Sequence, residues 1–226
     1  MPSAAAGLSA VLLAAGESER MGSINKLTLP IGDQPLLRRT AQMLSRCDLV
    51  ELVAVVGHEQ HIAREMLRGL ALRTIYNEAF RDGQMTSVYC GLAALEKPCA
   101  GVMICLADQV LLNGEDIGRI CRGFEACPTS IMVPVHNGAR GNPVVLDYAH
   151  RDTILKDKKN LGCRRLIEKN PDLDKWKPDP HLFSSITSQT KNWRDFTPLE
   201  DAEYIENELS YLMDKLNIER YTTQHN

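Results

Sequence analysis

The sequence has little net charge, few aromatic residues and no closely spaced pair of cysteines. Its 226 residues carry a formal charge of −3, and 5% of them are aromatic. Without a strong positive charge, the chain has no overall field that attracts nucleic acid, so an anionic ligand needs local cations or a metal ion. The seven cysteines form no CxxC pair. Their odd number and wide spacing favour reduced thiols in a cytoplasmic protein over a disulfide framework or a zinc site.

No apolar run is long enough to cross a bilayer. The run SAVLLAA, residues 9–15, has no basic residue before it, and Arg20 is the first Arg or Lys of the chain. A secretory signal normally begins with positive charge, and a membrane-spanning helix needs about 20 apolar residues. We therefore expect a buried first strand and no membrane partner.

Short apolar segments alternate with segments of helical periodicity. This alternation predicts a three-layer α/β fold with a mainly parallel sheet, in a single domain over residues 1–226. The expected strands cover residues 9–15, 50–57, 72–77, 100–108, 130–135 and 143–147, and the expected helices cover 34–47, 59–70, 83–96, 113–126 and 199–216.

The fold class also predicts where a ligand binds. In open α/β sheets, ligands lie beyond the carboxyl ends of the strands, at a switch in strand order. The loop after residues 9–15 and the residue Asp108 both follow such ends. In a 3-2-1-4 order the first and fourth strands are neighbours, so we expect the loop to face Asp108.

The opening loop has the composition of a phosphate-binding loop. Gly16 and Gly22 permit tight turns and close backbone approach, while Arg20 and Lys26 supply fixed positive charge. The spacing matches neither a Walker P-loop nor GxGxxG, and an ordinary βα connection is the alternative. Asp108 ends a very apolar strand, where a carboxylate suits Mg²⁺ bound with phosphate oxygens, although a turn Asp is also common. Together the two features favour a magnesium–nucleotide site.

Four stretches occur in an order and spacing that resemble the molybdenum cofactor nucleotidyltransferase family, in particular the molybdopterin cytidylyltransferases. They are LAAGESERMGSINKLTLP (13–30), DGQMTSVYCGLAAL (82–95), LADQ (106–109) and GARGNPVVL (138–146). The resemblance implies a Rossmann-like nucleotide-diphosphosugar-transferase fold. It also implies transfer of a nucleotidyl group from an NTP to the phosphate of molybdopterin, with release of pyrophosphate.

The resemblance carries residue roles as well. It implies that Arg20 and Lys26 bind the triphosphate and that these two residues and Asp108 are catalytic, with Asp108 holding Mg²⁺. It implies a nucleotide site at Leu13, Ala14, Ala15, Gly16, Arg20, Lys26, Gly83 and Ser87, and an acceptor pocket at Gly138, Arg140, Gly141, Asn142 and Pro143.

The chain departs from the family pattern in three places. Glu19 stands where relatives often carry a second arginine, and LADQV lacks the proline that usually follows Asp-Gln. The second metal-binding carboxylate belongs to a late DxDTPED stretch, which here reads RDFTPLED. A gapless alignment assigns this role to Asp195, whereas alignment on Thr-Pro does not.

Three functions remain open from the sequence. The first is transfer to molybdopterin, with CTP as donor because Ala15 stands where guanylyl-transferring relatives usually have glycine. The second is transfer to another phosphate monoester, although sugar-type relatives usually show Pro-Lys in place of Asn25-Lys26. The third is a non-catalytic carrier or chaperone that delivers cofactor to a molybdoenzyme. The HEQH sequence at residues 58–61 is interpreted as a solvated helix start.

Overall fold

The computed structural model describes residues 7–18, 25–126, 131–136 and 139–156. All of them belong to the compact unit Met1–Thr190. The predicted helix over residues 199–216 lies outside the described residues, so the expectation of a single domain stays a prediction. No helix among the described residues is long and apolar enough to cross a membrane.

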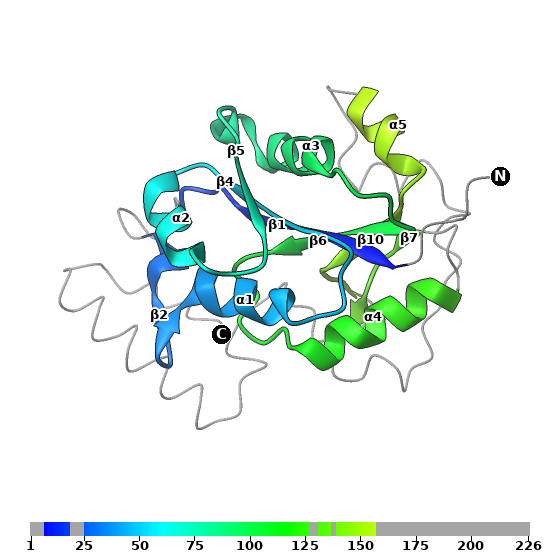
Figure 1. Ribbon diagram of the computed structural model, residues 1–226, viewed down its shortest axis with the longest axis horizontal. Helices are drawn as coiled ribbons and strands as arrows, with labels where there is room; N and C mark the ends of the chain where they lie inside the picture. Colours follow the sequence, from blue (N-terminus) through cyan, green and yellow to red (C-terminus); the bar gives the residue numbers. More distant parts are fainter. Residues whose placement is uncertain (1–6, 19–24, 127–130, 137–138, 157–226) are drawn as a thin grey trace, which may run out of the picture. The chain divides into compact units, whose positions relative to one another are not determined.

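A six-stranded sheet forms the centre of the described fold (Figure 1). The first four strands in the order of the sheet pair in parallel. The fifth strand is antiparallel to both of its neighbours, the fourth and the sixth. The order is β5 (Arg73–Tyr76), β4 (Leu52–Val56), β1 (Leu8–Ala14), β6 (Gly101–Leu106), β10 (Val144–Asp147) and β7 (Ile131–Met132). The mainly parallel sheet and the 3-2-1-4 order of its first four strands are confirmed.

Helices cover both faces of this sheet, as the three-layer prediction required. Buried residues of three helices pack on one face and those of two helices on the other. The first group is α1 (Leu36–Ser45), α2 (Gln60–Leu67) and α4 (Gly114–Ala126), and the second is α3 (Gln84–Ala94) and α5 (His150–Lys156). Short elements complete the fold: η2 (Lys26–Thr28), β2 (Pro30–Ile31), β3 (Gln34–Pro35), η3 (Phe80–Asp82), β8 (Val135–His136) and β9 (Ala139–Arg140).

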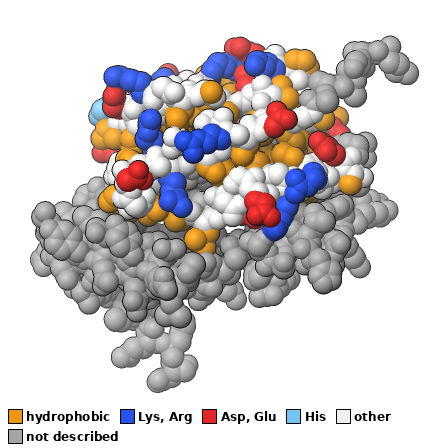
Figure 2. Space-filling model, turned by 60° about the horizontal axis from the view of Figure 1, so that its bottom comes forward, with side chains coloured by type: hydrophobic (Ala, Val, Ile, Leu, Met, Phe, Trp, Pro, Cys, Tyr) orange, Lys and Arg blue, Asp and Glu red, His pale blue; other side chains and the backbone are white. Residues whose placement is uncertain are grey.

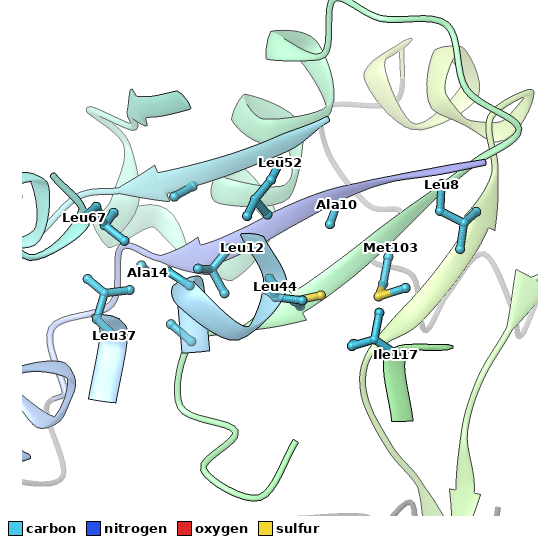
Figure 3. Packing of buried hydrophobic residues seen from close by; sticks show 14 of the residues in the cluster. Leu8, Ala10, Leu12, Ala14, Leu37, Leu44, Leu52, Leu67, Met103 and Ile117 are labelled. Carbon is cyan, nitrogen blue, oxygen red and sulfur yellow. The ribbon is translucent and has the colours of Figure 1, made fainter. Parts of the chain in front are cut away.

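The central strand β1 is buried along its whole length. Its side chains alternate between the two faces, so a continuous apolar run is what a strand between two helix layers needs. Figure 3 shows Leu12 among the residues that meet Leu37 and Leu44 of α1. On the other face a Cβ on Gly91 would lie 2.2 Å from a Val11 methyl. Helix α3 therefore packs directly onto β1, which brings its N-terminal turn to the carboxyl end of that strand.

The structure differs from the predicted secondary structure in two places. The single strand predicted over residues 130–135 is divided into β7 and β8, which pair with different partners. Pro134, which lacks an N–H, lies between them, and its carbonyl accepts a hydrogen bond from Gly141 N at 2.7 Å. Helix α5 was not predicted. It has seven residues, of which only Ile154 is buried, so its periodicity is too short to recognise.

Candidate functional site

The carboxyl ends of β1 and β6 lie side by side. Leu13 pairs with Leu106, and Ala107 N donates to Leu13 O at 3.1 Å. The chain leaves this edge through the opening loop on one side and through Asp108 on the other. Lys26 Nζ lies 2.5 Å from Asp108 Oδ2, although 82 residues separate the two. The opening loop and Asp108 therefore face each other, as the strand order predicted.

A cavity of about 350 Å³ adjoins this ion pair. Its lining includes residues 13–16, Lys26, Ser87 and Asp108, all of which the sequence had singled out. Phe80 and Gln84 also line it; Gln84 lies in the family-like stretch 82–95 without having been assigned a role, and the sequence had given no signal for Phe80. The volume is within the range of small-molecule sites, and the wall combines apolar groups with a few convergent polar ones.

Hydrogen bonds fix the segment that carries Lys26. Lys26 N donates to Ser18 Oγ at 3.2 Å, and Leu27 N donates to Asn25 Oδ1 at 3.0 Å. Asn25 Nδ2 donates in turn to Glu59 Oε2 at 3.0 Å, just before α2. The start of η2 is thus hydrogen-bonded to Glu59, in the connection between β4 and α2. Ser18 belongs to the same family-like stretch as Lys26, but the sequence did not indicate this hydrogen bond. It gave no signal for Glu59, because nothing in the local pattern relates that residue to Lys26.

The start of α3 forms another wall of the cavity. Gly83 has φ +107°, a conformation that side-chain-bearing residues rarely adopt, so a glycine is needed before this helix. Ser87 is 4% exposed, and its hydroxyl accepts a hydrogen bond from Asn77 Nδ2 at 2.9 Å. Asn77 also donates to Thr86 Oγ1 at 2.8 Å. Asn77 follows β5 and holds the first turn of α3 against the sheet.

The Asp108 turn is attached to two neighbours. Thr40 Oγ1 of α1 donates to Ala107 O at 3.1 Å. Gln109 is buried, and its Nε2 donates to Asn142 O at 3.0 Å. The Asp-Gln pair therefore connects the nucleotide-side edge with the Asn142–Pro143 turn expected to border the acceptor.

The other expected acceptor residues are only partly described. Gly141 is buried, and its N–H bonds to Pro134 O. Arg140 lies in β9, and Gly138 lies outside the described residues. Arg20 and Asp195 also lie outside them, so their predicted roles stay predictions.

A tight turn, one of the two uses expected of a glycine at position 16, is not what the structure shows. The φ of Gly16 is not in the left-handed region, and an added Cβ would meet no heavy atom within 4 Å. A tight turn or internal close approach therefore does not explain this glycine. It leaves open space beside the cavity, which is what a ligand-facing backbone needs.

The HEQH segment lies at the rim of the site and is not simply a solvated helix start. His58 N donates to Ala15 O at 3.1 Å, and His58 Nδ1 lies 3.6 Å from Glu17 Oε1. Glu17 also accepts hydrogen bonds from Arg81, which raise the pKa of that guanidinium. These contacts join the opening loop to the starts of α2 and α3.

The described residues contain no group of three or more His, Cys, Asp or Glu side chains able to hold a metal ion. The carboxylate of Asp108 faces the cavity edge with 36% of its side chain exposed. One carboxylate fits Mg²⁺ or Mn²⁺ when substrate phosphates supply further oxygens, but it does not make a metal site on its own.

A larger cavity lies elsewhere in the described fold. It measures about 1000 Å³ and is lined by residues of α1 and α4, including Met43 and Ile117, and by Cys47, which follows α1. Figure 2 shows this side of the molecule, where hydrophobic side chains lie between charged ones. None of the residues predicted to bind nucleotide or acceptor lines it.

Curated proteins of similar sequence include the following three. Bifunctional protein GlmU of Chromobacterium violaceum is 33% identical over 52% of this chain and 31% of its own length. The 2-C-methyl-D-erythritol 4-phosphate cytidylyltransferase of Prochlorococcus marinus is 33% identical over 46% of this chain and 49% of its own. The molybdenum cofactor guanylyltransferase of Vibrio campbellii is 26% identical over 79% and 89%. The chain thus spans less than half of the first two relatives and most of the third.

Solved structures share the fold at low sequence identity. Rv0371c from Mycobacterium tuberculosis superposes with a TM-score of 0.62 at 22% identity, covering 74% of this chain and 84% of that one. The complex of the same protein with manganese gives a TM-score of 0.58 at 19% identity, covering 72% and 82%. A divalent metal is therefore present in a structure of this fold.

The family assignment depends on a longer match. Residues 10–174 match the family described as the MobA-like NTP transferase domain, and this range includes the opening loop, the start of α3, the Asp108 turn and the Asn142–Pro143 turn. The resemblance found in the four sequence stretches is confirmed, and the chain belongs to the MobA-like NTP transferase family.

Proposed function

We propose that the chain transfers a cytidylyl group from CTP to the phosphate of molybdopterin and releases pyrophosphate. The observation that carries the proposal is the meeting of Lys26 with Asp108 at 2.5 Å, beside a cavity formed by residues 13–16 and the start of α3. A cation and a carboxylate at one sheet edge are what an enzyme needs to bind a triphosphate together with a metal ion.

The reaction needs no protein nucleophile. An oxygen of the acceptor phosphate forms a bond to the α-phosphorus of the NTP, while the bond from that phosphorus to pyrophosphate breaks and pyrophosphate leaves with the electron pair. The protein holds the two anions in line and offsets their repulsion. In this proposal Lys26 contacts the phosphates, Arg20 adds a second positive charge, and the α3 start at Gly83 and Ser87 lies by the base or ribose.

Asp108 is proposed to hold Mg²⁺, with Asp195 as the second carboxylate. A bound magnesium ion would offset negative charge on the phosphate oxygens during transfer. In the ion pair Asp108 contacts Lys26 through Oδ2, so Lys26 must move toward the phosphates if this oxygen is to become a ligand.

Ala15 supports CTP as the donor. It is 4% exposed, lines the cavity, and stands where guanylyl-transferring relatives usually have glycine. The similarity to a molybdenum cofactor guanylyltransferase makes GTP the competing donor, and the similarity to a 2-C-methyl-D-erythritol 4-phosphate cytidylyltransferase makes another phosphate monoester the competing acceptor.

Pyrophosphate release across the four NTPs, with and without molybdopterin, tests the proposal. We expect release with CTP and molybdopterin together, in a Mg²⁺-dependent manner. Asp108→Asn should lower turnover on the order of 100-fold, as for loss of a main electrostatic stabiliser. Release with 2-C-methyl-D-erythritol 4-phosphate in place of molybdopterin would favour the second function. Tight binding of molybdopterin without turnover for any NTP would favour a carrier. Turnover by Asp108→Asn near that of the wild type would refute the metal assignment.

A further inference from the structure

Two backbone outliers lie on either side of the dipeptide that carries Lys26. Among the described residues, the non-glycine positions with positive φ are Ser18, at 57°, and Glu59, at 47°. Ser18 Oγ accepts a hydrogen bond from Lys26 N, and Glu59 Oε2 accepts one from Asn25 Nδ2. Such conformations persist only where the surroundings hold them, and they cluster at functional sites. Both outliers here support the same two residues.

A role in capping helix α2 does not explain why a glutamate occupies position 59. Glu59 occupies the N-cap position of that helix, where Ser, Thr, Asp or Asn would bond the first turn. The Glu59 side chain makes no such capping bond. It extends instead to Asn25, which lies 34 positions earlier in the sequence. Its side chain is 36% exposed, so it does not contribute to the core either.

The contact with Asn25 determines how η2 begins. Because Asn25 Nδ2 donates to Glu59, the amide oxygen of Asn25 is directed toward Leu27 N, from which it accepts a hydrogen bond at 3.0 Å. Lys26 lies between these two anchored residues. The Glu59 carboxylate also faces a titratable side chain. His58 Nε2 lies 3.8 Å from Glu59 Oε2.

We propose that Glu59 is a positioning residue for Lys26. It acts through Asn25, orients the start of η2 and thereby directs the Lys26 ammonium to the Asp108 edge of the cavity. The inference rests on the proposed nucleotidyl transfer and adds to it a residue outside the four family-like stretches. Glu59 itself is not among the residues that line the cavity.

Two substitutions at Glu59 distinguish the effect of its side-chain carboxylate from the effect of its left-handed backbone. Glu59→Gly suits a φ of 47° at least as well as glutamate does, so it removes the side chain without adding strain. Glu59→Gln keeps an acceptor oxygen for Asn25. We expect Glu59→Gly to lower kcat about tenfold, with KM for the NTP within about threefold, because misplacement of a group acting in the transition state lowers turnover. Glu59→Gln should retain kcat within about threefold of the wild type by the same argument.

A double-mutant cycle tests whether the effect passes through Lys26. In a Lys26→Ala background, Glu59→Gly should cause no further loss of kcat. Glu65→Ala, at an exposed site on the same helix, is the control and should leave kcat unchanged. An equal tenfold loss with and without Lys26, or full activity of Glu59→Gly in the wild-type background, would overturn the proposal.

A measurement without nucleotide distinguishes this inference from the function on which it rests. Reductive ¹³C-methylation keeps the lysine charge and gives each lysine an NMR signal, and Lys26→Arg identifies the one from Lys26. We expect Glu59→Gly, but not Glu59→Gln, to move this signal toward those of exposed lysines. An unmoved signal in Glu59→Gly refutes the positioning role. Lack of pyrophosphate release by the wild type would instead refute the proposed transfer.

Discussion

Lys26 Nζ and Asp108 Oδ2 are 2.5 Å apart across the carboxyl ends of β1 and β6. The sequence assigns the first to phosphates and the second to a metal ion, yet in the structure they neutralise each other. Both side chains are about one-third exposed, at 34% and 36%. Water and ligands can therefore reach the pair, and its contribution to folding is small. Under the proposed function, the pair keeps the site charge-balanced until an anionic ligand competes for Lys26.

Removal of Lys26 should affect metal binding and turnover in opposite directions. Lys26→Met removes a cation that competes for the Asp108 carboxylate, so Mn²⁺ should bind the nucleotide-free protein on the order of tenfold more tightly. Turnover should fall, with kcat reduced more than KM rises, if Lys26 contacts charge that shifts during transfer.

Electron paramagnetic resonance of free Mn²⁺ measures the affinity of the nucleotide-free protein for Mn²⁺. Lys97→Met, at a lysine that bonds to Val50 O, is the control. Equal or weaker Mn²⁺ binding in Lys26→Met would contradict the competition.

Gly16→Ala should reduce ligand binding without reducing stability. The added methyl meets no heavy atom of the chain within 4 Å, and the backbone of Gly16 is not left-handed. Replacement of glycine at a compatible site raises stability by about 0.4–1 kcal/mol through the unfolded state. The methyl would occupy space beside the cavity, so we expect KM for the NTP to rise about tenfold.

Thermal unfolding and steady-state kinetics measure the two effects of Gly16→Ala. Gly114→Ala, where an added Cβ also meets nothing within 4 Å, should leave KM unchanged. An unchanged KM in Gly16→Ala would show that the ligand does not approach this backbone.

Glu51 stabilises the end of the sheet that lies away from the site. It is 8% exposed and accepts hydrogen bonds from Arg73 Nε at 3.1 Å and from the backbone N–H of Glu96 and Lys97. Burial by itself raises the pKa of the Glu51 carboxyl, but these hydrogen bonds outweigh it and hold the pKa below its usual range.

Glu51→Gln should therefore destabilise the fold in a pH-dependent way. The lowered pKa contributes stability that is fully present above the unfolded value, about 4.3, and is lost as pH falls through the folded value. We expect a loss of about 1–3 kcal/mol at pH 7 that shrinks below about pH 4. Urea unfolding at several pH values measures it. Glu65→Gln, at an exposed ion pair with Arg68, should change stability by less than about 1 kcal/mol. A Glu51→Gln loss that does not vary with pH would contradict the assignment.

The sequence predicted the elements whose signal is local and repeated. The short, almost wholly apolar run SAVLLAA predicted β1, and the alternation of strands with helices predicted a strand order that brings Lys26 to Asp108. Gly83 was identified within a family-like stretch, and its φ of +107° gives the physical reason for a glycine there.

The sequence could not predict the side-chain pairs that hold the site. Asn25 with Glu59, Asn77 with Ser87, and Gln109 with the carbonyl of Asn142 are single polar contacts between distant segments. Such residues are ordinary in composition, and their partners are defined only once the sheet has brought the segments together. Pro134, in contrast, was a signal against one continuous strand, since proline cannot donate to a ladder.

The Ala15 methyl bears on the choice between CTP and GTP. Ala15 follows β1, and its carbonyl accepts a hydrogen bond from His58 N. Its methyl would lie 2.8 Å from a Cβ placed on Gly57. The same imagined Cβ would lie 2.7 Å from Phe80 Cβ, so Ala15, Gly57 and Phe80 pack together at the wall of the cavity. Because a purine is larger than a pyrimidine, a filled wall at this point favours the smaller base.

Ala15→Gly should shift the preference toward GTP. One methyl in a pocket discriminates by about 1–3 kcal/mol, so we expect the ratio of kcat/KM for CTP to that for GTP to fall by about tenfold or more. Ala10→Gly is the matched control, because it removes a buried methyl from β1, the strand that ends just before Ala15, outside the cavity lining, and should reduce stability without changing the ratio. The measurement is kcat/KM for both nucleotides with one acceptor. A wild type that prefers GTP would overturn the choice of CTP. An unchanged ratio in Ala15→Gly would mean that polar contacts to the base edge, not the Ala15 methyl, decide between the two nucleotides.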